Sequence, residues 1–157
     1  MAYDFKKLLA VSKRRVPDEP VGLYLYSLEF ARVLLPKADS AQGLAVGKEL
    51  QGVALFYFRV CLEQARKARL KKGRPQNKAD AAFVYAMARL WESLWGPPKF
   101  RKYRQPRKGE IGGKEAPTGF QRVCNAWMEI VDPDRPGPLT AAAFKGASKH
   151  LRRHPKH

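Results

Sequence analysis

The stretch TGFQRVCNAWMEIV, residues 118–131, carries the clearest helix signal in the chain. Thr118 and Gln121 stand at the spacing of a capping box, in which each side chain bonds to the other residue's backbone amide. Apolar side chains then recur at steps of three and four, on one face of a helix. They are Phe120, Val123, Cys124, Trp127, Met128 and Val131. An amphipathic helix needs a core to pack on, so this segment predicts a helical globular domain.

The segments on either side repeat this pattern. Three prolines within residues 132–138 end the helix, and Thr140 is placed to cap a last one. That helix directs Phe144, Ala147 and Leu151 inward and Lys145, Lys149, Arg152 and Arg153 outward. Upstream, Asn77 and Asp80 resemble a capping pair. The helix they open carries Phe83, Met87, Leu90, Trp91 and Leu94 on one face and ends at Gly96, Pro97 and Pro98. We expect Trp91, Trp95 and Trp127 to belong to the core.

The N-terminal half predicts three further helices. Residues 3–11 have the apolar spacing of a short docking helix, and residues 21–35 form a buried helix that stops at Pro36. A long helix runs from a cap at Ser40 loosely to Lys72, with a break expected near Gly52 because three glycines weaken its first half by roughly 1 kcal/mol each. Residues 53–62 are apolar on every face except at Arg59, which predicts the buried central helix of the domain. The alternative is a buried strand, although the continuation over residues 63–70 favours a helix.

Together these patterns predict an all-α fold with five or six helices around one hydrophobic core. A chain of 157 residues with 45% apolar content fits one domain. We place this domain at residues 1–153, with a long basic loop over residues 97–117 between the fourth and fifth helices and a flexible basic tail over residues 154–157. Cys61 and Cys124 lie among apolar neighbours and are interpreted as buried thiols in a reducing compartment. Because residues 1–15 lack the apolar core of a signal peptide and no apolar run could span a bilayer, we expect a cytoplasmic protein that does not associate with membranes.

Charge is the leading indication of function. The chain carries 31 Lys and Arg against 14 Asp and Glu, a net charge of +17. Residues 59–114 hold sixteen of these cations and only four acids. Such an excess on a chain that folds indicates a polyanionic partner, and nucleic acid before any other.

Two basic clusters account for most of the excess. The first, at the end of the long helix, comprises Arg66, Lys67, Arg69, Lys71, Lys72 and Arg74. The second, in the predicted loop, comprises Lys99, Arg101, Lys102, Arg104, Arg107 and Lys108, with Phe100 and Tyr103 between them. Guanidinium groups hold phosphates and aromatic rings stack on unpaired bases, so these cations and Tyr103 are the predicted nucleic-acid-binding residues. The alternatives are a solvated helix end for the first cluster and, for the second, a flexible loop whose two aromatic side chains anchor it to the core.

The sequence therefore predicts a nucleic-acid-binding accessory protein that contacts mainly the phosphates of DNA or RNA. The alternative is a protein-interaction module, an adaptor or inhibitor, that docks on a larger nucleic-acid-handling complex. Whether the two clusters share one face is not decided by the sequence. A helix-turn-helix with residues 140–153 as the recognition helix is disfavoured, because the seven-residue connection before it is too long.

No catalytic signature accompanies these clusters. The chain has no phosphate-binding glycine loop with its lysine, no GxSxG and no HExxH, so we expect no enzymatic activity and no cofactor. His150 and His154 have the spacing of metal ligands, with His157 nearby, but no Cys or carboxylate accompanies them. They are interpreted as part of a basic tail, and no metal site is predicted.

Three segments of the C-terminal half resemble small proteins encoded beside recombinases on bacterial mobile elements. The residues that carry the resemblance are 82–95 (AFVYAMARLWESLW), 117–123 (PTGFQRV) and 132–153, which include PLTAAAF. The resemblance covers about half of the chain and brings no catalytic motif or binding residue with it. It implies an accessory role in mobile-DNA biology.

Overall fold

The computed structural model describes residues 20–68, 78–101 and 117–155, and within them the fold is all-helical, as predicted. Five helices are described: α2 (Pro20–Leu34), α3 (Ser40–Ala68), α4 (Lys78–Trp95), α5 (Gly119–Val131) and α6 (Ala141–Arg153). The helix predicted at residues 3–11 and most of the predicted basic loop lie outside the described residues.

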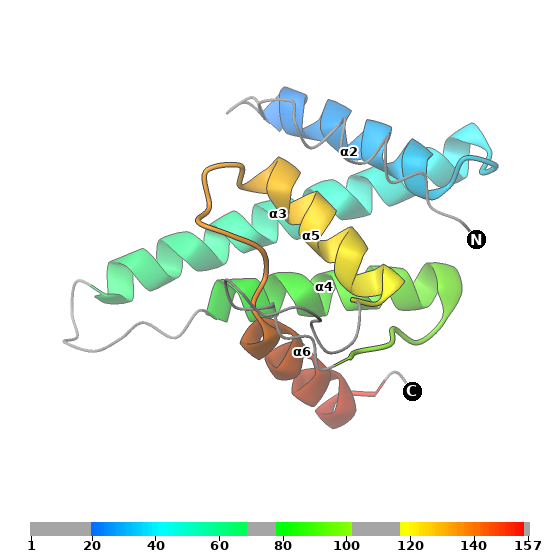
Figure 1. Cartoon of the computed structure of the whole chain (residues 1–157). Coiled ribbons are helices and arrows are strands. Elements are labelled where there is room, and N and C mark those ends of the chain that lie inside the picture. Colours follow the sequence, from blue (N-terminus) through cyan, green and yellow to red (C-terminus); the bar gives the residue numbers. More distant parts are fainter. Residues whose placement is uncertain (1–19, 69–77, 102–116, 156–157) are drawn as a thin grey trace, which may run out of the picture.

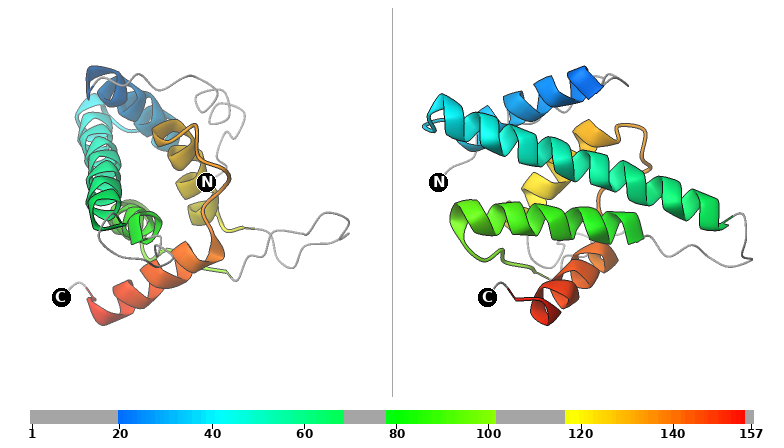
Figure 2. Two further views of the ribbon diagram at one scale, coloured as in Figure 1. Left: turned by 90° about the vertical axis from the view of Figure 1, so that its left-hand side faces the viewer. Right: turned by 180° about the vertical axis from the view of Figure 1, so that it is seen from behind.

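The helices form two layers. Helices α2, α3 and α4 lie side by side, and α5 crosses them on one side while packing against α2 and α4 (Figure 1). Helix α6 packs on the flank of α4, so the order across the molecule is α2, α3, α4, α6 in every view (Figure 2). The pairing of α6 with α4 differs from a helix-turn-helix, in which α6 would pack on α5.

The core lies between the two layers, and the predicted stripe of α5 fills it. Trp127 of α5 packs against Phe30 of α2 with ring centroids 4.9 Å apart. Phe120 at the other end of α5 meets Trp91 of α4 edge-on at 5.5 Å. Trp127 is fully buried, while Trp91 and Trp95 are partly buried against the core, as expected for core side chains. The capping box of Thr118 and Gln121 is present in full.

Helix α3 corrects two details of the prediction. It is continuous through Gly52, where a break was expected. Its first turn is capped by Asp39, whose carboxylate accepts the backbone N–H of Gln42 at 2.7 Å, and not by Ser40. The glycines lower the helix propensity of this segment, but packing against α2 outweighs that effect. At Gly47 the two helices approach so closely that a Cβ there would lie 2.6 Å from a methyl carbon of Leu28. That glycine therefore permits the close approach of α2 to α3.

The second half of α3 corrects a third expectation. Residues 53–62 are helical, but they are not buried on every side as a central helix would be. Val53, Ala54 and Tyr57 face the core. The large apolar side chains that stay exposed over this stretch are Leu55, Phe56, Phe58 and Leu62, at 39–61% of their full area. The right-hand view of Figure 2 shows α3 in front of the other described helices, with none of them covering it. The all-apolar pattern predicted burial on every side, and this prediction was wrong because the sequence does not show how many neighbouring helices cover a given helix.

None of the helices within the described residues combines the length and the apolar character that crossing a membrane requires.

Candidate nucleic-acid interface

Helix α6 carries the most completely described basic surface of the chain. Lys145, Lys149, Arg152 and Arg153, here called the α6 basic face, are all exposed as predicted, and the helix contains no Asp or Glu. Their spacing of four, three and one places them on one side of the helix over about 12 Å. Duplex DNA carries about seven phosphates over that length of its axis, counting both strands, which is more than the number of cations on this face.

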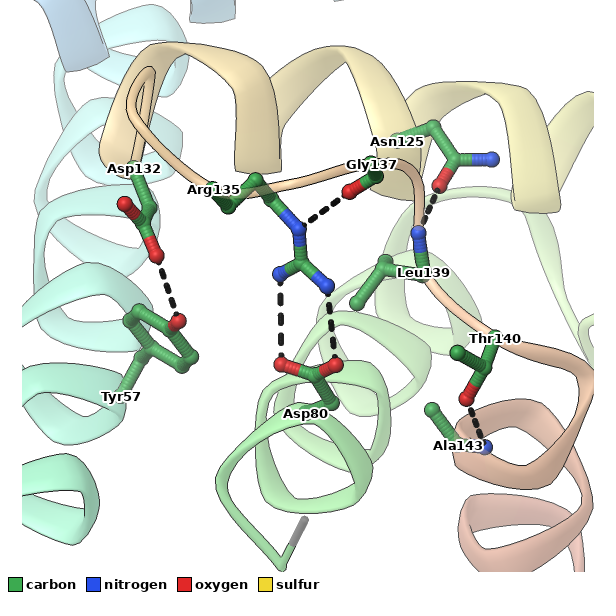
Figure 3. Close-up of polar contacts among 9 residues, drawn as sticks. All are labelled: Tyr57, Asp80, Asn125, Asp132, Arg135, Gly137, Leu139, Thr140 and Ala143. Atoms are coloured by element: carbon green, nitrogen blue, oxygen red, sulfur yellow. Dashed lines mark hydrogen bonds and ion pairs between the residues drawn. The ribbon is translucent and has the colours of Figure 1, made fainter.

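A buried polar network positions the N-terminal end of α6 (Figure 3). In the connection from α5, Arg135 forms a bidentate pair with Asp80 at the start of α4, with N···O distances of 3.2 and 2.9 Å. The Asp80 side chain is 2% exposed and that of Arg135 is 12% exposed. Burial is the largest single effect and would lower the pKa of the Arg135 guanidinium, but the hydrogen bonds and the charge attraction of Asp80, with smaller contributions from Tyr57 and Asp132, together raise the pKa. The connection is therefore tied to α4 through a guanidinium that stays charged.

Three neighbouring hydrogen bonds complete this anchor. The Tyr57 hydroxyl of α3 donates to Asp132 at 2.8 Å, which fixes the end of α5. The backbone N–H of Leu139 donates to the Asn125 side chain at 2.9 Å, and Thr140 caps α6 by accepting the N–H of Ala143. Burial and the bond to Asp132 raise the pKa of the Tyr57 phenol, so it stays a donor.

The C-terminal end of α6 is held by α4. The guanidinium of Arg89 donates to the backbone carbonyl of His154, the residue that ends α6. Cations are favourable at a helix C-terminus because its carbonyls carry partial negative charge. Arg89 also bonds to Tyr85 and Glu92 within α4, and His150 lies between Tyr85 and His154 with ring centroids 5.7 Å from each. Between the two ends of α6, Gly146 allows this helix to approach α4 closely, since a Cβ at Gly146 would lie 3.3 Å from the Cβ of Ala81.

The root of the predicted basic loop is fixed to the N-terminus of α5. The carbonyl of Lys99 accepts from the Thr118 hydroxyl at 2.8 Å, and that of Arg101 accepts from the Gln121 amide at 3.0 Å. Both basic side chains are exposed. The segment that follows α4 passes beside α6 in all three views (Figures 1 and 2). Phe100 packs against Phe120 at 5.4 Å and is partly buried, so it anchors the loop to the core and does not offer a free stacking face.

The remaining predicted binding residues are placed only in part. Lys67 is exposed near the end of α3, and Arg66 belongs to the same helix. Arg69, Lys71, Lys72, Arg74, Lys102, Tyr103, Arg104, Arg107 and Lys108 lie outside the described residues. The question of whether the two predicted clusters share one face therefore falls outside the described residues. The basic face that the structure does describe, on α6, was expected to point outward but was not counted as part of the site, although four cations and no acid in thirteen residues were a usable signal.

Other chemistry in the described residues is sparse. An open hollow of about 520 Å³ lies between α3 and α4, lined by Val53, Phe56 and Leu90 with Glu49 and Arg89 as its charged residues. No group of three or more His, Cys, Asp or Glu side chains gathers as metal ligands would within the described part of the chain. Cys124 is buried as predicted, whereas Cys61 of α3, which was also predicted to be buried, is only partly buried against the core.

No family model, curated protein or solved structure matches this chain. The resemblance to proteins of mobile elements therefore stays a prediction.

Proposed function

We propose that this protein binds nucleic acid, DNA or RNA, chiefly through phosphate contacts made by the α6 basic face together with the basic loop rooted at residues 99–101. The observation that carries the proposal is the α6 basic face: four exposed cations without an acid, on a helix held at both ends by α4. A rigid support matters because less side-chain and backbone freedom is lost when the surface binds.

The surroundings of this face support the same partner. The chain carries a net charge of +17, so a polyanion that neutralises it relieves self-repulsion. Lys99 and Arg101 extend the positive charge from a segment that passes beside α6. Phosphate contacts of this kind position a protein on nucleic acid without reading its sequence. We therefore propose binding that depends weakly on sequence and strongly on salt.

The test is fluorescence anisotropy with labelled single-stranded DNA, duplex DNA and single-stranded RNA at salt concentrations between about 50 and 200 mM. Each phosphate contact contributes about 0.9 to the slope of log affinity against log salt for duplex DNA. The variant K145Q/K149Q/R152Q/R153Q should lower that slope by up to about 3.6. Over this salt range such a slope corresponds to about a 150-fold change in affinity.

Two further variants locate the effect. K99Q/R101Q should lower the slope by up to about 1.8, because it removes two contacts at the root of the loop. R32Q/K37Q removes two exposed cations beside α2, away from α6, and should leave the slope nearly unchanged. Absence of binding to all three nucleic acids below about 10 µM at low salt would refute the proposal, since even non-specific binders reach that range. That result would favour the predicted alternative, docking on another protein.

A further inference from the structure

The outward face of α3 carries exposed apolar side chains that the described core does not use. Leu44, Leu55, Phe58 and Leu62, here called the α3 outer stripe, are 40%, 48%, 39% and 61% exposed. The stripe extends for about 27 Å along the helix. Lys48 and Gln51 separate Leu44 from the other three, whereas Leu55, Phe58 and Leu62 adjoin one another. Exposed apolar side chains scattered singly need no explanation, but adjoining ones on one face indicate a contact surface.

The spacing of the stripe is that of a helix–helix seam. Leu44, Lys48, Gln51, Leu55, Phe58 and Leu62 follow one another at steps of four, three, four, three and four. This alternation keeps one line of side chains facing a partner helix along its whole length, as the a and d positions of a coiled coil do. The opposite face of α3, with Leu50, Val53 and Tyr57, is buried against the core. One face of α3 therefore packs against the core, and no described helix covers the opposite face.

The charges beside the stripe suit a second copy of the same chain. Although the whole protein is strongly basic, Lys48, Glu49, Arg59 and Glu63 give this part of α3 two charges of each sign. Lys48 precedes Leu55 by seven residues and Glu63 follows it by eight. An antiparallel pair of α3 helices related by a two-fold axis near Leu55 thus sets Lys48 of each copy against Glu63 of the other. A uniformly acidic partner helix would place like charges against Glu63, which is unfavourable.

We infer that the α3 outer stripe is a self-association surface, through which two copies of this chain form an antiparallel, two-fold symmetric dimer. The inference goes beyond the proposed nucleic-acid binding and does not depend on it. The two-fold axis is perpendicular to the plane of the two paired helices, so each remaining helix lies on the same side of the pair in both copies. Helix α4 flanks α3 on one side and α6 lies beyond α4, so both lie on that same side in each copy. The dimer then presents two α6 basic faces on one side.

Net charge determines how this association responds to salt. Two copies that each carry +17 repel one another, and salt screens that repulsion within a Debye length of about 8 to 10 Å. Dimerisation through the stripe should therefore strengthen as salt rises, whereas nucleic-acid binding should weaken. This opposite response keeps the two proposals separable in the same preparation.

Sedimentation equilibrium on the full chain tests the inference, from about 5 to 200 µM protein in moderate and in high salt. We expect a monomer–dimer equilibrium that L55Q and L62Q each weaken about tenfold or more, since each removes an apolar side chain from both halves of the interface. The matched control is L25Q. Leu25 is 56% exposed but lies on α2, outside the stripe, and its loss should leave the equilibrium unchanged. Circular dichroism verifies that each variant folds.

A charge swap tests the antiparallel arrangement itself. K48E and E63K should each weaken the dimer, and K48E/E63K should recover most of the loss. Fifteen residues separate these positions, about 22 Å along one helix, so recovery requires contact between copies. A protein that stays monomeric at about 200 µM in high salt would overturn the inference and leave the stripe to an unrelated partner. Equal weakening by L25Q and L55Q, or a double charge variant as weak as the single ones, would overturn it as well.

Discussion

Replacing Arg135 with methionine removes one half of the buried pair that ties the α5–α6 connection to α4. Its two hydrogen bonds to Asp80, of 2.9 and 3.2 Å, are lost, together with the one from its Nε to the Gly137 carbonyl. The carboxylate of Asp80, only 2% exposed, then remains without its guanidinium. Breaking a buried ion pair from one side costs about 3 to 5 kcal/mol, because the charge left behind has lost its opposite charge and is poorly solvated. We expect R135M to lower the free energy of unfolding by about that amount, a large part of the 5 to 15 kcal/mol typical of a domain.

The assay is urea denaturation at neutral pH followed by tryptophan fluorescence, which reports on the buried Trp127. D80N should cost less, about 2 kcal/mol, since the amide still accepts one hydrogen bond and the guanidinium, at 12% exposure, retains some access to water. The double variant D80N/R135M should be more stable than R135M alone, because the side chain left at position 80 is then uncharged.

Two results would contradict this reasoning. One is an R135M protein within about 1 kcal/mol of the wild type, which would mean that the pair contributes no more than an exposed one. The other is a double variant whose loss equals the sum of the single losses, which would mean that the two side chains do not interact.

Three further predictions concern the helices and the thiols. G43A should raise the free energy of unfolding by up to about 1 kcal/mol in thermal or urea denaturation, because a Cβ there meets nothing within 4 Å and alanine is the better helix former. T118A should cost about 1 kcal/mol, through loss of the capping box, and should increase proteolysis near Lys99, whose carbonyl bonds to the Thr118 hydroxyl. Burial raises the pKa of the Cys124 thiol well above its ordinary value, so the folded state holds this proton more tightly than the unfolded chain does. Stability is therefore retained below about pH 8.5 and falls as the pH rises above it, and C124A should show a smaller fall between neutral and alkaline urea titrations.

Local patterns in the sequence predicted the described helices, but they could not predict contacts between residues that are distant along the chain. The capping box of Thr118 and Gln121 involves residues three apart, and both of its hydrogen bonds are present. At the start of α3 two adjacent residues, Asp39 and Ser40, were both chemically able to cap, and only geometry distinguishes them. Arg135 and Asp80 are 55 residues apart, so no local pattern could indicate that they pair.

The site proposed from the structure differs in its residues from the one that the sequence predicts. Charge counting favours the densest clusters, and most of those residues lie outside the described part of the chain. The α6 basic face is less dense along the sequence, yet it is a site candidate because Arg89 and the Asp80–Arg135 pair hold the helix at both ends. Phe100 shows the same limit, since its interleaving with cations suggested base stacking while its contact with Phe120 uses it for packing.

The two proposed surfaces have a joint consequence that neither has alone. A dimer paired through the α3 outer stripe places both α6 basic faces on one side, so one strand of nucleic acid can engage them together. The second contact is then intramolecular, and its effective concentration, which can reach the millimolar range, raises the overall affinity without any new contact. L55Q, which leaves every cation in place, should therefore weaken binding to a long duplex more than binding to a duplex that spans only one face. Equal weakening on both lengths would show that the two surfaces act independently.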